Sequence, residues 1–171
     1  SRFRFTPIPE KHMQARTAEI AAGEGCDLTP DGLQALLALS RGDMRRVLNV
    51  MQACAMASPK IDQARVYEVT GQPHPADIAN ILKSLMQDNF ATARQTLLET
   101  KTRKGLALAD IVTALAELVG KTALPQHAVC YLYERLSDVE NNLTAATHEE
   151  AQLAGVVAAF ILARELSKPN E

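Results

Sequence analysis

The residues best placed to do chemistry are two consecutive arginines, Arg45 and Arg46, which follow Asp43 in the segment 40–49 (SRGDMRRVLN). Aspartate is a common cap of helix N-termini, so the pattern predicts that both arginines lie in the first turn of a helix. Positive side chains are unfavourable there, because the helix dipole is positive at its N-terminus. The plainest interpretation is a capped helix with two solvated arginines. The pair becomes favourable if one guanidinium faces an anion such as a phosphate, which a helix N-terminus also attracts.

Two other basic segments are weaker candidates. The segment 120–122 (GKT) ends like a phosphate-binding loop, but the first glycine of that motif would fall at Leu115, inside an apolar helical run. We therefore interpret Gly120 as a helix terminator. The segment 101–104 (KTRK) is a second basic cluster, and we expect it in a solvated loop before Gly105.

The sequence contains no recognisable catalytic or metal site. The cysteines show no CxxC spacing and the histidines no metal-ligand spacing, so we expect buried or partly buried thiols and scattered histidines. These residues are Cys26, Cys54, Cys130, His12, His74, His127 and His148.

The elements that carry these residues are predicted to be helices, which gives an all-α fold class. Apolar side chains recur at helical spacing, and Thr29, Asp43 and Asp62 are predicted N-caps. The expected helices cover residues 10–22, 30–40, 44–57, 63–69, 75–87, 90–100, 107–120, 126–143 and 149–166. The opening residues 1–5 alternate like a strand, and the segment 70–75 (TGQPHP) is the best internal boundary.

Composition and charge restrict the function. The 171 residues are 47% hydrophobic and 22% charged, with a net charge of −2, as in soluble globular proteins. Residues 1–70 have nine basic and eight acidic side chains, and the remainder has nine and twelve. Neither part has the positive surplus that a duplex-DNA binder needs. No signal-peptide pattern opens the chain and the most apolar stretch is too short to span a bilayer, so we expect a soluble intracellular protein with no membrane partner.

Five segments resemble the small subunits of the eukaryotic clamp loader, replication factor C, most nearly the branch called subunit five in animals and subunit three in yeast. Residues 42–49 (GDMRRVLN) resemble the sensor 2 motif of that branch of AAA+ ATPases. Residues 1–5 (SRFRF) with Pro7 are similar to the linker that leaves the ATPase core. Residues 104–111 (KGLALADI) and 136–143 (LSDVENNL) resemble collar segments, and residues 77–82 (DIANIL) also match this family.

The resemblance implies a helical AAA+ lid over residues 1–70 and a five-helix collar over residues 72–171. The ATPase core would lie upstream, so this chain alone should not hydrolyse ATP. Arg45 would be the sensor 2 arginine that reaches the γ-phosphate of ATP, with Mg²⁺ present in the complete subunit, and Pro7 would lie on the adenine side. The collar would bind the other clamp-loader subunits. The complete complex would bind the sliding clamp and primer–template DNA in the nucleus.

Other interpretations remain open from the residues alone. One is a stand-alone helical adaptor that binds proteins and no nucleotide. The strand-like opening and the paired arginines argue against this interpretation. Another is the lid of a different AAA+ machine, such as a bacterial clamp loader or a Holliday-junction motor. Direct DNA binding by the collar is a third, disfavoured by its negative charge.

Overall fold

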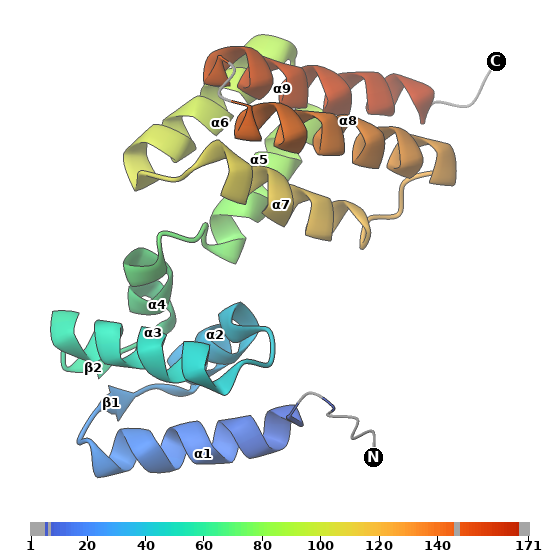
Figure 1. The fold of residues 1–171 in the computed structure, drawn as a ribbon. Coiled ribbons are helices and arrows are strands. Elements are labelled where there is room, and N and C mark those ends of the chain that lie inside the picture. The colour runs from blue at the N-terminus through green and yellow to red at the C-terminus, as the bar shows by residue number, and fades with distance from the viewer. Residues whose placement is uncertain (1–5, 7, 146–147, 168–171) are drawn as a thin grey trace. The chain divides into compact units, whose positions relative to one another are not determined.

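The computed structural model describes residues 6, 8–145 and 148–167 (Figure 1). The strand expected over residues 1–5 lies outside these residues. The described residues form nine helices and two strands of two residues each, so the predicted all-α class is confirmed. The chain divides between Gln72 and Pro73 into two compact units, each with its own core.

The first unit contains four helices, and three of their starts follow side-chain caps visible in the sequence. Thr29, Asp43 and Asp62 accept hydrogen bonds from backbone N–H groups of the helices that they precede, as predicted. The elements are α1 (Glu10–Gly23), β1 (Asp27–Leu28), α2 (Pro30–Ser40), α3 (Met44–Ala57), β2 (Lys60–Ile61) and α4 (Gln63–Thr70).

A parallel pair of strands, which was not predicted from the sequence, joins the segment before α2 to the segment before α4. Leu28 of β1 pairs with Ile61 of β2. Thr29 donates its hydroxyl to the Ile61 carbonyl at 3.0 Å. Gly32 lies so close to this strand that an added Cβ would clash with the Ile61 carbonyl oxygen. The start of α2 therefore requires glycine at this position.

An acidic side chain, Asp31, lies in the first turn of α2 and also contacts the start of α4. The Asp31 carboxylate accepts a hydrogen bond from the Gln63 backbone N–H at 3.0 Å. This bond, helped by the Thr29 hydroxyl, holds the pKa of Asp31 below its ordinary value. Asp31 thus connects the N-termini of α2 and α4.

The core of the first unit is formed by buried residues of all four helices and of β2. Val47 and Cys54 of α3 are fully buried, and Met51 lies between them. Burial raises the pKa of the Cys54 thiol, which disfavours the thiolate. Cys26 is partly buried, whereas Cys130 is exposed, so the expectation of buried or partly buried thiols is wrong for Cys130.

The second unit is a bundle of five helices. They are α5 (Pro75–Gln87), α6 (Phe90–Lys104), α7 (Leu108–Val119), α8 (Gln126–Thr144) and α9 (Glu149–Leu166). Helices α8 and α9 run side by side (Figure 1). Helix α6 continues four residues beyond the predicted end, through the basic segment, and stops at Gly105, which has a φ of 64°.

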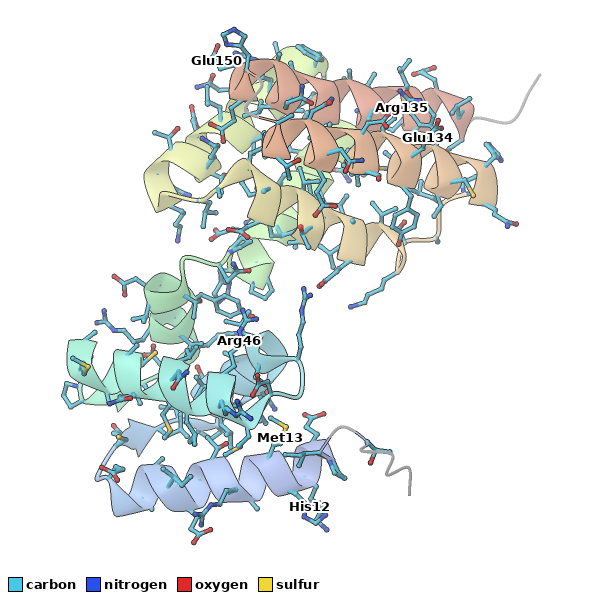
Figure 2. The ribbon with its side chains drawn as sticks, in the orientation of Figure 1. His12, Met13, Arg46, Glu134, Arg135 and Glu150 are labelled. Carbon is cyan, nitrogen blue, oxygen red and sulfur yellow. The ribbon has the colours of Figure 1, made fainter. Side chains whose placement is uncertain are left out.

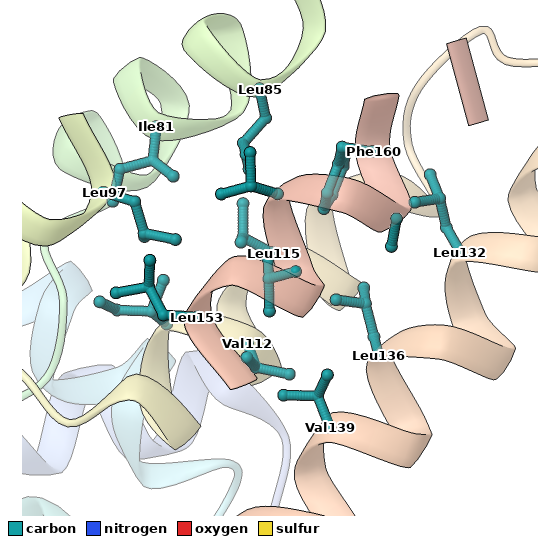
Figure 3. Close-up of a cluster of buried hydrophobic side chains, with 14 of the residues drawn as sticks. Ile81, Leu85, Leu97, Val112, Leu115, Leu132, Leu136, Val139, Leu153 and Phe160 are labelled. Atoms are coloured by element: carbon teal, nitrogen blue, oxygen red, sulfur yellow. The ribbon is translucent and has the colours of Figure 1, made fainter. Parts of the chain in front are cut away.

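The core of the second unit is almost entirely aliphatic, as Figure 3 shows. Phe160 of α9 is its one fully buried aromatic side chain among the described residues. Arg164 connects the end of α9 to the end of α5 by donating to the Asp88 carbonyl at 2.6 Å and the Leu85 carbonyl at 3.3 Å. These contacts satisfy carbonyls that a helix C-terminus leaves without partners.

Candidate functional site

The candidate site lies at the N-terminus of α3, where Asp43 forms the predicted cap. Its carboxylate accepts hydrogen bonds from the backbone N–H of Arg45 at 2.9 Å and of Arg46 at 3.4 Å. The acceptor therefore satisfies two of the N–H groups that the first helical turn leaves free. The negative charge of the cap offsets part of the unfavourable interaction between the arginines and the helix dipole.

Packing of α3 determines the side of the helix from which Arg45 projects. Val47, Met51 and Cys54 face the core and fix the rotation of the helix about its axis. Arg45 precedes Val47 by two positions, or about 200° of helix rotation. Its side chain is therefore exposed on the opposite face, as the apolar spacing of α3 indicates.

Arg46 lies about 100° further round the helix than Arg45 and is also exposed, on the first turn of α3 (Figure 2). Within the part of the chain that the structure describes, neither guanidinium has a hydrogen bond or an ion pair. Two adjacent cations thus stand at the positive end of a helix with Asp43 as the nearby acid. This arrangement can hold an anion that comes from outside the described chain.

A hollow of about 570 Å³ in the same unit adjoins this turn. It is open to solvent and is lined by both apolar and polar residues. The start of α1, the end of α2 and the connection to α3 supply its walls. The lining residues are Ile8, Glu10, Met13, Gln34, Leu37, Ala38, Arg41 and Gly42.

This hollow has no signal in the sequence, because its walls come from segments far apart in the chain. Pro7, the residue predicted on the adenine side, lies outside the described residues. Its neighbour Ile8 lines the hollow and is 48% exposed. Arg45 is not among the lining residues, so the structure does not bring the two predicted site positions into one described cavity.

The second basic cluster, residues 101–104, was expected in a solvated loop. In the structure it forms the last turn of α6. Lys101 pairs with Glu149 of α9 at 3.0 Å, and Lys104 pairs with Asp77 of α5 at 3.6 Å. Positive charge is favourable at a helix C-terminus. The expectation of a loop was wrong because this polar segment has no apolar periodicity that would indicate a helix. Its helical turn is stabilised by these ion pairs and by the Gly105 cap.

The remaining motifs supply no further site. Gly120 is the C-cap residue of α7, which confirms its interpretation as a helix terminator rather than as part of a phosphate loop. In the described ranges, no group of three or more histidine, cysteine or acidic side chains could hold a metal ion. None of the described helices is long and apolar enough to cross a membrane.

Comparisons with known proteins address both units. Residues 73–159 match the family described as the replication factor C C-terminal domain. The chain is 40% identical over 166 residues to replication factor C subunit 5 of Mus musculus, covering 97% of this chain and 49% of the relative, with the same values for Homo sapiens. Subunit 3 of Schizosaccharomyces pombe is 37% identical over 94% of this chain and 47% of its own length. The chain thus spans about half the length of the curated relatives that it matches.

Proposed function

This chain belongs to the replication factor C family, and on that premise we propose that it forms the AAA+ lid and the collar of a clamp-loader small subunit. Residues 1–70 act as the lid and residues 72–171 as the collar. In the complete machine, ATP drives the opening of the sliding clamp and its placement on primer–template DNA in the nucleus. This chain contributes nucleotide sensing and assembly, and by itself it does not hydrolyse ATP.

The observation that carries the proposal is the exposed arginine pair on a capped helix N-terminus. In a subunit with an ATPase core, Arg45 would interact with the γ-phosphate of the ATP and Mg²⁺ held by that core. Its charge would then be compensated by the phosphate, and the position of the lid would depend on the nucleotide. The neighbouring hollow supports this proposal, because its lining includes Ile8 and mixes apolar with polar residues, as a site for an adenine ring requires.

The second unit suits a role in assembly with other clamp-loader subunits. Its aliphatic core and the Arg164 contacts hold the five helices together in one bundle. Large apolar side chains nevertheless remain exposed on α8 and α9, at Tyr133, Leu162 and Leu166. Exposed apolar surface is the usual material of subunit interfaces.

The nucleotide-sensing role is tested by Arg45→Ala in the complete subunit. A charge-assisted hydrogen bond is worth about 1.5–3 kcal/mol, so we expect ATP affinity to fall roughly tenfold to hundredfold. Arg16→Ala is the matched control, since Arg16 is exposed on α1 of the same unit and pairs with Glu19. Unchanged ATP affinity in Arg45→Ala would refute the sensing role.

The assembly role is tested separately with this chain. Light scattering would measure its mass alone and mixed with the corresponding parts of related small subunits. A defined hetero-oligomer supports the collar assignment. A monomer indifferent to every related subunit above micromolar concentration would contradict assembly through this chain and favour an adaptor with other partners.

A further inference from the structure

The connection between α2 and α3 has an unusual backbone. Arg41 has a φ of 51° and a ψ of 36°, and it is the one non-glycine residue with a positive φ among those that the structure describes. Gly42 follows with a φ of 87°. Two successive residues thus lie in the region that L-amino acids with a Cβ disfavour.

Two other helices end with the usual C-cap, a single glycine in the left-handed conformation. Helices α4 and α6 end at Gly71 and Gly105, with φ values of 65° and 64°. Each uses a single left-handed residue, and that residue is glycine. The α2–α3 connection instead uses two, with an arginine in the first, and therefore stores strain beside the arginine pair.

Hydrogen bonds and burial fix the backbone on either side of Arg41 and Gly42. On one side the Ser40 hydroxyl donates to the Leu37 carbonyl at 2.7 Å, and the Ser40 carbonyl accepts from the Asp43 N–H at 3.1 Å. On the other side Val47 is fully buried. Between these fixed points, the conformation of Gly42 decides where the Asp43 carboxylate stands relative to the first turn of α3.

We propose that Gly42 is a positioning residue for Arg45. Its left-handed conformation places the Asp43 cap, and the cap holds the first turn of α3 in the orientation from which the Arg45 guanidinium projects. The inference rests on the proposed sensing role of Arg45, but its first consequence concerns the cap alone. An L side chain at position 42 rotates the backbone toward negative φ and loosens the turn, whereas a D side chain fits the observed φ.

The test compares both alanine enantiomers at position 42 of this chain. Gly42→Ala can be expressed, and D-alanine can be introduced on a synthetic segment 26–53 ligated at the Gly25–Cys26 and Ala53–Cys54 junctions that the sequence supplies. Loss of an N-cap predicts that amide hydrogen exchange at Arg45 and Arg46 rises about fivefold to tenfold in Gly42→Ala. D-alanine should restore the wild-type rates.

Gly71→Ala is the matched control, because its φ is similar and an added Cβ meets nothing within 4 Å. It should lower global stability without changing exchange at the start of α3. Equal exchange rates for the two enantiomers at position 42 would overturn the proposal.

A second measurement separates positioning from a general structural effect. In the complete subunit, Gly42→Ala should lower ATP affinity, but combined with Arg45→Ala it should add no further loss, because it acts through that side chain. An additive loss would overturn the positioning role. If Arg45→Ala alone had no effect on affinity, the sensing function would fail, while the exchange data would still report on the cap.

Discussion

The first turn of α3 and the last turn of α6 both gather positive side chains, with opposite consequences for the fold. At the end of α6, Lys101 and Lys104 have acidic partners on α9 and α5, and the helix dipole favours them. At the start of α3, Arg45 and Arg46 face an unfavourable dipole and have no side-chain partner in the described residues. The charges of the α6 cluster are therefore compensated within the fold, whereas we propose that those of the α3 cluster are compensated by a ligand that comes from elsewhere.

The largest expected effect concerns the core that supports the α6 cluster. Phe160→Ala removes a fully buried ring from α9, the helix that also carries Glu149. It should lower the free energy of unfolding by about 3–5 kcal/mol, as for other buried aromatic truncations. Chemical denaturation measures this change. Phe90→Ala is the matched control, because Phe90 is 43% exposed in the same unit, and a loss as large as that of Phe160→Ala would contradict the assignment of the core.

A smaller effect is expected at the cap of the α3 cluster. Asp43→Ala removes the acceptor for two backbone N–H groups and should cost about 0.5–2 kcal/mol of stability, measured by the same denaturation. Asp43→Asn keeps a capping oxygen and loses the charge, so it should recover most of that stability. If Asp43→Asn is as unstable as Asp43→Ala, the aspartate acts through its charge on the arginines and not as a hydrogen-bond acceptor.

How much of this comparison can be predicted from the sequence depends on the range of the contacts. The caps at Thr29 and Asp43 act within three residues, so residue type and spacing predict them. The exposure of Arg45 follows from the helical spacing of the buried residues of α3. These signals are local, so they predicted the helix starts at these caps and the exposed position of Arg45, whose role in binding stays a prediction.

What could not be predicted depends on partners distant in sequence. The β1–β2 pair is two residues long on each side, too short for a periodic signal, and exists because Leu28 meets Ile61. The last turn of α6 was missed because its ion pairs reach to Asp77 and Glu149. The left-handed conformation of Arg41 has no sequence signal, since its residue type would normally argue against it.

The smallest expected effects distinguish the two clusters most directly, because they have opposite signs. Arg45→Gln removes a cation from the positive end of α3 and should raise stability by about 0.3–1 kcal/mol. Lys101→Gln removes a cation from the negative end of α6 together with its ion pair, and should lower stability by a similar amount. Thermal unfolding at low and high salt measures both changes, and salt should shrink both, since it screens exposed charges. A loss of stability in Arg45→Gln would mean that the arginine is already engaged in the fold, and the ligand-facing interpretation of the α3 cluster would then be wrong.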